Sequence, residues 1–151
     1  MSKCCCFGHR EVYKNVEGAL SDIVEKLITE QNITEFWVGG LGEFDGKFAS
    51  AVRAKKKQYP DVQLILIKPY FSGELNTNKE YYEYAYDDII IPDAVAGVHY
   101  KSAITKRNRW MVDNCDVIVT FVYRDFGGAY DAKKYAVKSG KTVIELNDYI
   151  D

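Results

Sequence analysis

Two glycine-rich junctions contain the residues whose types and spacing best fit ligand chemistry. In the first, the apolar stretch 36–38 stops at Gly39, Gly40 and Gly42, and a helical pattern starts at about Phe44. Glycines at a strand-to-helix turn let the backbone approach a ligand closely, and the helix that follows presents free N–H groups and its positive dipole end. The preferred ligand of such a turn is an anion such as phosphate.

The second junction comes late in the chain and repeats this chemistry. Phe126 is followed by Gly127 and Gly128, and a predicted helix then begins at about Ala129 and Tyr130. Two such junctions in one small chain indicate a nucleotide-like ligand, with phosphate on the backbone N–H groups and Tyr130 as a candidate to stack on the base.

Basic and histidine residues follow the first predicted strand, in the sequence Gly8, His9 and Arg10. Because the planar fork of arginine grips phosphate or carboxylate, we expect Arg10 to bind the ligand. His9 either contacts the ligand or makes structural hydrogen bonds, and the sequence does not decide between the two. Arg107 and Asn108 lie in the amino-terminal half of a later helix, where we expect Arg107 to be near the surface and to pair with an anion.

Acidic and aromatic residues complete the candidate site. Glu43 and Asp45 follow the first glycine turn. Asp45 either caps the helix there or binds ribose hydroxyls. Pro69 and Tyr70 follow the third strand, and Tyr70 is a second candidate to stack on a base.

Two familiar phosphate motifs do not apply. A dinucleotide fingerprint follows the first strand and ends in Gly or Ala, and the next strand ends in an acid. Here the turn follows the second strand, Asp45 stands at the last position, and the next strand ends in Lys68. Gly140-Lys141-Thr142 resembles the tail of a Walker motif, but it precedes a strand and is a helix stop.

Alternating strands and helices must position these residues. The expected strands are 3–7, 34–38, 62–67, 88–92, 116–122 and 142–146, and the expected helices are about 15–31, 44–59, 102–114 and 129–139. This order predicts an α/β, Rossmann-like three-layer domain with a mainly parallel central sheet and helices on both faces. Ligands of such sheets bind beyond the carboxyl ends of the strands, near a switch in strand order. The candidate residues follow those strand ends.

Length and composition predict one ordinary globular domain. The chain has 151 residues, 47% of them hydrophobic and 28% charged, and we expect a single domain over 1–151. The stretch of about 71–100 is expected to be an irregular insertion, a lid or a partner surface, rich in tyrosine at Tyr81, Tyr82, Tyr84 and Tyr86.

Charge and cysteine usage restrict the partners. A net charge of −2 argues against a general nucleic-acid binder. We find no apolar run long enough to span a bilayer and no secretory signal, so we expect no membrane partner and a cytoplasmic location. Cys4, Cys5, Cys6 and Cys115 are expected to be reduced and buried; three adjacent cysteines alternate faces in a strand, so we expect no metal site.

Catalysis has little direct support. Neither a Ser-His-Asp nor a Cys-His arrangement is apparent, and paired carboxylates at a defined spacing are missing. We therefore assign no catalytic residue and no cofactor.

Together these motifs resemble the SLOG superfamily, in particular its YpsA-like branch of phage and Firmicute proteins. The residues that carry the resemblance are Cys6 to Arg10, Gly39 to Asp45, Arg107 to Asp113, and Gly127-Gly128. They occur in the right order over nearly the whole chain. The resemblance implies a Rossmann-like domain that binds nucleotides or ADP-ribose-type ligands. More distant relatives include the LOG phosphoribohydrolases, which activate cytokinins, and the DprA proteins of DNA uptake.

The match to the LOG enzymes is incomplete. Arg107 stands four residues before Met111, as their catalytic arginine stands before its methionine. Their glutamate comes seven residues after the first glycine of a Gly-Gly-x-Gly-Thr motif, and that position here is Lys134. The expected function is therefore non-catalytic binding of a nucleotide or ADP-ribose-derived ligand, in sensing or sequestration, as in a phage-type sponge for an immune signal.

Two alternatives remain: an N-glycosidic hydrolase, with Glu43, Asp45 or Asp131 in place of the missing glutamate, and an interaction protein that uses the tyrosine-rich insertion. The partners expected are this small molecule and further copies of the chain, as a homodimer or higher homo-oligomer, with no nucleic acid. The expected ligand-binding residues are Gly8, His9, Arg10, Gly39, Gly40, Gly42, Glu43, Phe44, Asp45, Pro69, Tyr70, Arg107, Asn108, Gly127, Gly128, Ala129 and Tyr130.

Overall fold

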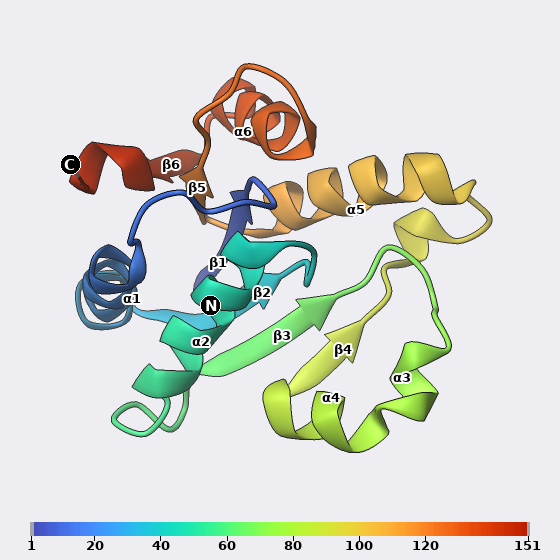
Figure 1. Ribbon diagram of the computed structural model, residues 1–151, viewed down its shortest axis with the longest axis horizontal. Coiled ribbons are helices and arrows are strands. Elements are labelled where there is room, and N and C mark those ends of the chain that lie inside the picture. Colours follow the sequence, from blue (N-terminus) through green and yellow to red (C-terminus); the bar gives the residue numbers. More distant parts are fainter. Residues whose placement is uncertain (1, 151) are drawn as a thin grey trace.

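Short apolar strands, most of them followed by a helix, form a parallel sheet covered on both faces (Figure 1). A computed structural model describes residues 2–150, and within them the sheet has six strands in the order β4-β3-β2-β1-β5-β6, all parallel. The strands are β1 (Ser2–Gly8), β2 (Ile33–Val38), β3 (Gln63–Ile67), β4 (Asp88–Ile90), β5 (Val117–Phe121) and β6 (Thr142–Glu145). The predicted fold class is confirmed.

Helices cover the two faces of the sheet in pairs. The longer ones are α1 (Glu17–Gln31), α2 (Glu43–Lys55), α5 (Tyr100–Asn114) and α6 (Gly128–Lys138). One apolar cluster joins α1 and α2 to one face, and a second joins α5 and α6 to the other. Successive residues of β1 supply both clusters, with Cys4 and Cys6 in the first and Cys5 in the second.

The segment 71–100 is more regular than the sequence analysis predicted. It contains α3 (Glu74–Thr77), α4 (Lys79–Ala85), β4 and a 3₁₀ turn η1 (Asp93–Val95). Its first part, with α3 and α4, is a helical crossover between β3 and β4 and not an irregular insertion. Helices α3 and α4 are short, and the buried residue in them is Ala85. The sequence there therefore lacks the repeated apolar positions that predict a helix. A second 3₁₀ turn, η2 (Leu146–Tyr149), follows β6.

The strand order places a switch point between β1 and β5. From β1 the chain moves outward through β2, β3 and β4, and α5 then returns it to the other side of β1. Gly8 pairs with Phe121 at the carboxyl ends of these two strands. In open α/β sheets this is the usual place for a ligand.

Candidate functional site

A pocket of about 340 Å³ lies at this switch point, between the loops that follow β1 and β5. Its volume lies near the lower end of the range of about 300–1,000 Å³ that is typical of ligand pockets. It is lined by Phe7, Gly8, His9, Arg10, Leu41, Asp45, Ile104, Arg107, Asn108, Arg124, Gly127, Gly128 and Ala129. Nine of the predicted ligand-binding residues are in this set, so the fold brings them together from four separate stretches of sequence.

The β1–α1 loop is held tightly against the sheet and α2. A Cβ atom on Gly8 would lie 2.3 Å from the ring of Phe44, so this position requires glycine. The His9 N–H donates to the carbonyl of Phe121, and the Arg10 carbonyl accepts from the N–H of Glu43. Arg10 itself is exposed at the pocket edge.

The first glycine junction is closed by the protein itself. Gly42 has a φ of 89°, and a Cβ there would lie 2.8 Å from the Cα of Arg10. The N–H of Leu41 donates to the Asp45 carboxylate, and that of Glu43 to Arg10. Phe44 is fully buried. The sequence predicted an open phosphate cradle here, but this turn packs α2 against the first loop.

Several other predicted site residues also have structural roles away from the pocket lining. The Glu43 carboxylate accepts from the N–H of Val12 and lies 4.0 Å from the Lys47 ammonium. Pro69 is buried at the end of β3, and Tyr70 beside it is 40% exposed. Among the residues described, none of these three lines the pocket at the switch point.

Asp45 is a buried acid beneath the pocket. Its carboxylate accepts from the Leu41 N–H at 3.1 Å and lies 3.7 Å from the Cys6 sulfur. Burial is the main cause that raises the pKa of Asp45 to about 6, against the opposing effects of the Leu41 N–H and the nearby Arg107. Since the helix begins after Gly42 without a side-chain cap, Asp45 is not the helix cap.

Arg107 is buried, contrary to the prediction that it lies near the surface. Its Nη1 donates to the carbonyls of Gly39 at 3.1 Å and Ile67 at 2.7 Å, and its Nε donates to Asn108 Oδ1 at 2.9 Å. The side chain therefore joins the ends of β2 and β3 to α5. Burial lowers its pKa, and the neighbouring Asp45 opposes that effect.

The Arg107 contact also fixes the orientation of Asn108. Because a guanidinium can only donate, the atom that faces Nε must be the amide oxygen of Asn108. The amide nitrogen is then turned away from Arg107, and Asn108 lines both the pocket and the groove beside it. Asn108 is thus a donor that its buried neighbour positions.

The second glycine junction is open. Gly127 has a φ of 99°, and a Cβ on Gly127 or Gly128 would meet no heavy atom within 4 Å. Both glycines are exposed, and within residues 2–150 the N–H groups of Gly128, Ala129 and Tyr130 have no hydrogen-bond acceptor. These groups form the amino-terminal turn of α6, where a bound anion is favoured.

Glu145 anchors the loop that leads to this junction. Its carboxylate accepts from the Val122 N–H at 3.1 Å, the Thr120 hydroxyl at 2.9 Å, the Lys133 ammonium at 2.9 Å and the Asn147 N–H at 3.0 Å. This network joins β5, β6 and α6, and so holds in place the loop that leads from β5 to Gly127. Nothing in the local sequence of Glu145 indicated this role.

Arg124 lines the pocket, and two aromatic rings lie against its guanidinium. The Arg124 guanidinium lies 5.2 Å from the ring of Tyr123 and 5.1 Å from that of Phe126. Phe126 is 60% exposed, so one of its faces is available to a ligand. Four lining residues were not predicted from the sequence: Phe7, Leu41, Ile104 and Arg124. The position of Arg124, three residues before Gly127, was the signal that could have indicated it.

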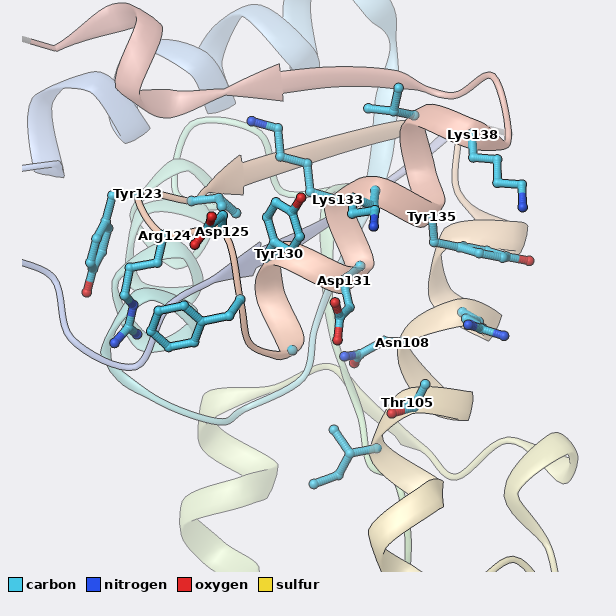
Figure 2. A pocket seen from close by; sticks show the side chains of 18 residues that line it. Thr105, Asn108, Tyr123, Arg124, Asp125, Tyr130, Asp131, Lys133, Tyr135 and Lys138 are labelled. Atoms are coloured by element: carbon cyan, nitrogen blue, oxygen red, sulfur yellow. The ribbon is translucent and has the colours of Figure 1, made fainter.

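A larger groove of about 1,220 Å³ adjoins the pocket along α5 and α6 (Figure 2). The pocket and the groove share Ile104, Asn108, Arg124 and Gly128. Tyr130 lines this groove, and Figure 2 shows the carboxylate of Asp131 pointing toward Asn108. Its cationic residues are Arg109, Arg124, Lys133, Lys134 and Lys138.

Across residues 2–150, no group of three or more His, Cys, Asp and Glu side chains is placed to hold a metal ion. None of the helices in the same range is long and apolar enough to cross a membrane.

Comparison with known proteins gives two kinds of match. No protein-family profile matches the chain. UPF0398 proteins from two strains of Bacillus cereus are 25% identical over 146 residues, which cover 93% of this chain and 71% of theirs. The structure of DNA processing protein A (DprA) from Streptococcus pneumoniae superposes with a TM-score of 0.66 and 17% identity, over 94% of this chain and 49% of that one. The chain is thus similar to the UPF0398 proteins over most of its length and shares the fold of DprA, in line with the predicted resemblance to the SLOG superfamily.

A second DprA structure corrects the expectation that was drawn from net charge. DprA from Helicobacter pylori, solved to explain its single-stranded DNA binding mode, matches with a TM-score of 0.63 and 16% identity over 98% of this chain and 70% of that one. The prediction of no nucleic-acid partner, which was drawn from the net charge, is therefore wrong. Net charge sums the whole molecule, whereas binding depends on local charge, and this chain places five Lys and Arg side chains along the α5–α6 groove. The chain spans about half the length of the pneumococcal DprA structure.

Proposed function

We propose that the protein binds a nucleotide or ADP-ribose-derived ligand at the switch-point pocket and does not cleave it. The observation that carries this proposal is the open turn at Gly127 and Gly128, which lines the pocket together with Arg10 and Arg124. Unpaired N–H groups and two guanidinium groups around one small pocket suit a phosphate group.

Each part of the ligand has a candidate partner. Phosphate oxygens accept hydrogen bonds from the α6 N–H groups and from Arg10 and Arg124. The exposed ring of Phe126 offers a stacking face for the base, and the Asn108 amide, which Arg107 orients, is available to a ribose hydroxyl. In this arrangement Arg107 and Asp45 support the pocket and do not grip the ligand directly.

Binding without cleavage follows from the residue that replaces the LOG glutamate. Lys134 is exposed, and its ammonium lies 5.5 Å from the Tyr130 ring centre, so no carboxylate is present at that position. The carboxylate of Asp45 is held by Leu41, and that of Glu43 by Val12. Asp131 in the groove is the remaining acid for a hydrolase, and Asp131→Asn tests it. A ligand held intact is sensed or sequestered, as by a phage-type sponge.

A second candidate function, single-stranded nucleic-acid binding, is favoured by the α5–α6 groove. Residues 100–141 contain nine Lys and Arg and four Asp and Glu, although the whole chain has a net charge of −2. Cationic and aromatic side chains alternate in this groove, with Arg109 over Tyr135 and Lys134 over Tyr130. A positive groove with stacking rings is the usual design for single strands, and DprA of this fold binds single-stranded DNA.

Calorimetry and chromatography with a ligand panel test both functions. The panel contains AMP, NAD, ADP-ribose and a short single-stranded oligonucleotide, and each mixture is afterwards analysed for products. We expect binding of at least one nucleotide without turnover. Gly128→Leu should abolish it, since its Cβ would meet no protein atom within 4 Å and the longer side chain would occupy the pocket that Gly128 lines. Gly18→Leu on α1, where an added Cβ also meets no atom, is the matched control. Released base would overturn non-catalytic binding, and oligonucleotide binding alone would favour the second function.

A further inference from the structure

His9 has a buried nitrogen atom without a partner. The residue is 4% exposed and lines the pocket, and its Nε2 finds no hydrogen-bond partner within the described residues 2–150. Leaving a buried polar atom unpaired destabilises the folded protein, so such an atom in a native structure calls for an explanation.

The surrounding elements fix the ring in its place. The His9 N–H is bonded to the Phe121 carbonyl, and the Tyr123 ring packs edge-on against the imidazole with 4.5 Å between the centroids. Tyr13 packs in turn on Tyr123 at 4.6 Å. The imidazole is therefore held rigidly, and the glycines at the start of α6 line the same pocket.

We propose that His9 Nε2 donates a hydrogen bond to a doubly charged oxyanion at the start of α6, and that binding of this anion places a proton from solvent on the imidazole. The inference rests on the proposed function and narrows its ligand to one with a terminal phosphate monoester, a dianion at neutral pH. A phosphodiester or a cyclic phosphate carries one charge and suits the site less well.

The charges that face the imidazole support this assignment. Burial, and then the Arg124 guanidinium, lower the pKa of His9 below its ordinary value, while Glu145 acts in the opposite direction. The Glu145 carboxylate is already engaged by Lys133 and other donors, and the Tyr123 ring packs edge-on against the imidazole. The other charged residues that line the same pocket are Arg10, Asp45 and Arg107. A dianion between His9 and Arg124 would offset the repulsion between them and favour the protonated ring.

The sign of the pH dependence follows from this linkage. The pKa of His9 is low in the free protein and higher with the anion bound, so protonation strengthens binding. The extra affinity for the anion is fully present below the pKa that His9 has in the free protein, which is itself below 6.5. It is lost as the pH rises through the pKa that His9 has with the anion bound. Acidification should therefore tighten binding of an anion that does not itself titrate.

Histidine NMR on the full chain tests the proposal, with inorganic sulfate as a non-titrating probe. The chain has two histidines, so His99, which is exposed and lies outside the pocket lining, is an internal control. We expect sulfate to raise the titration midpoint of His9 by about 1 pH unit, so that sulfate binds about tenfold more tightly at low pH than at pH 8. The ring signals of His99 should not move when sulfate is added at constant pH.

Variants and a second pair of probes complete the test. His9→Gln keeps an N–H donor but does not titrate, so it should bind sulfate with an affinity independent of pH. At pH 7.5, AMP should bind at least tenfold more tightly than cyclic AMP. Sulfate binding at Gly128 to Tyr130 with an unmoved His9 midpoint would overturn the inference and leave the proposed function intact, as would equal affinity for the two nucleotides. No binding of sulfate or any nucleotide would overturn both.

Discussion

The two glycine junctions have similar sequences and opposite structural roles. At the first, a Cβ on Gly42 would collide with the backbone of Arg10, and the carboxylate of Asp45 takes the Leu41 N–H. At the second, Gly127 and Gly128 are exposed and a Cβ at either would meet no atom. The difference arises from position in the sheet: the first follows β2, whereas the second follows β5 at the switch point. Glycine is needed for packing at the first junction. At the second it keeps the ligand site open, and Gly127 also has a positive φ of 99° that favours glycine.

Replacement of a glycine at each junction should separate these roles most strongly. Gly42→Ala combines a positive φ with a clash, and we expect it to lower the free energy of unfolding by about 4 kcal/mol. Gly128→Ala should change it by less than about 0.5 kcal/mol. Urea unfolding of both variants measures the difference. Equal losses would remove the distinction between a closed and an open junction.

Arg107 belongs to the closed half of this comparison. Arg107→Ala leaves the carbonyls of Gly39 and Ile67 without their donor, so we expect unfolding to become about 3 kcal/mol easier. Ligand affinity should fall less, through the loss of Asn108 orientation. Thermal unfolding of this variant measures its stability, and calorimetry measures its affinity for the ligand. A large loss of affinity at unchanged stability would show that Arg107 grips the ligand after all.

Asp45 gives the closed junction a pH signature. Its pKa of about 6 in the folded protein exceeds the unfolded value of about 3.9, so the folded state holds this proton more tightly. Its contribution to stability is full below about pH 4, falls as the pH rises, and is lost above about pH 6, a change of about 3 kcal/mol. Asp45→Asn should remove this component from the pH dependence of urea unfolding. A variant curve parallel to that of the natural protein would contradict the assignment.

At the open junction, loss of Arg124 should lower ligand affinity more than stability, the reverse of what we expect for Arg107. Its guanidinium is exposed at the pocket mouth, so Arg124→Gln should weaken nucleotide binding about tenfold, in line with about 1.5 kcal/mol for one hydrogen bond to a charged group. Stability should change by less than about 0.5 kcal/mol. Arg109→Gln, also exposed but outside the pocket lining, is the matched control for calorimetry. Similar losses of affinity in both would indicate only a general charge effect.

Sequence reasoning predicted the fold well because the alternation of apolar strands and helices is a local signal. It also placed the ends of β1, β2 and β5 correctly to within a few residues. It could not distinguish the two glycine turns, since that depends on strand order and on the loop after β1. For the same reason it expected Arg107 at the surface: the carbonyls that bury it belong to Gly39 and Ile67, far away in sequence. Short helices without an apolar period, such as α4, also escaped prediction.

Backbone NMR during titration with AMP tests the central claim most directly. The account predicts that the N–H signals of Gly128, Ala129 and Tyr130 shift as the ligand binds, because these groups have no acceptor within the described residues. The signals of Leu41 and Glu43, already bonded to Asp45 and Arg10, should move little. Large shifts at Leu41 and Glu43, with none at the start of α6, would show that the first junction is the ligand site and would contradict the account.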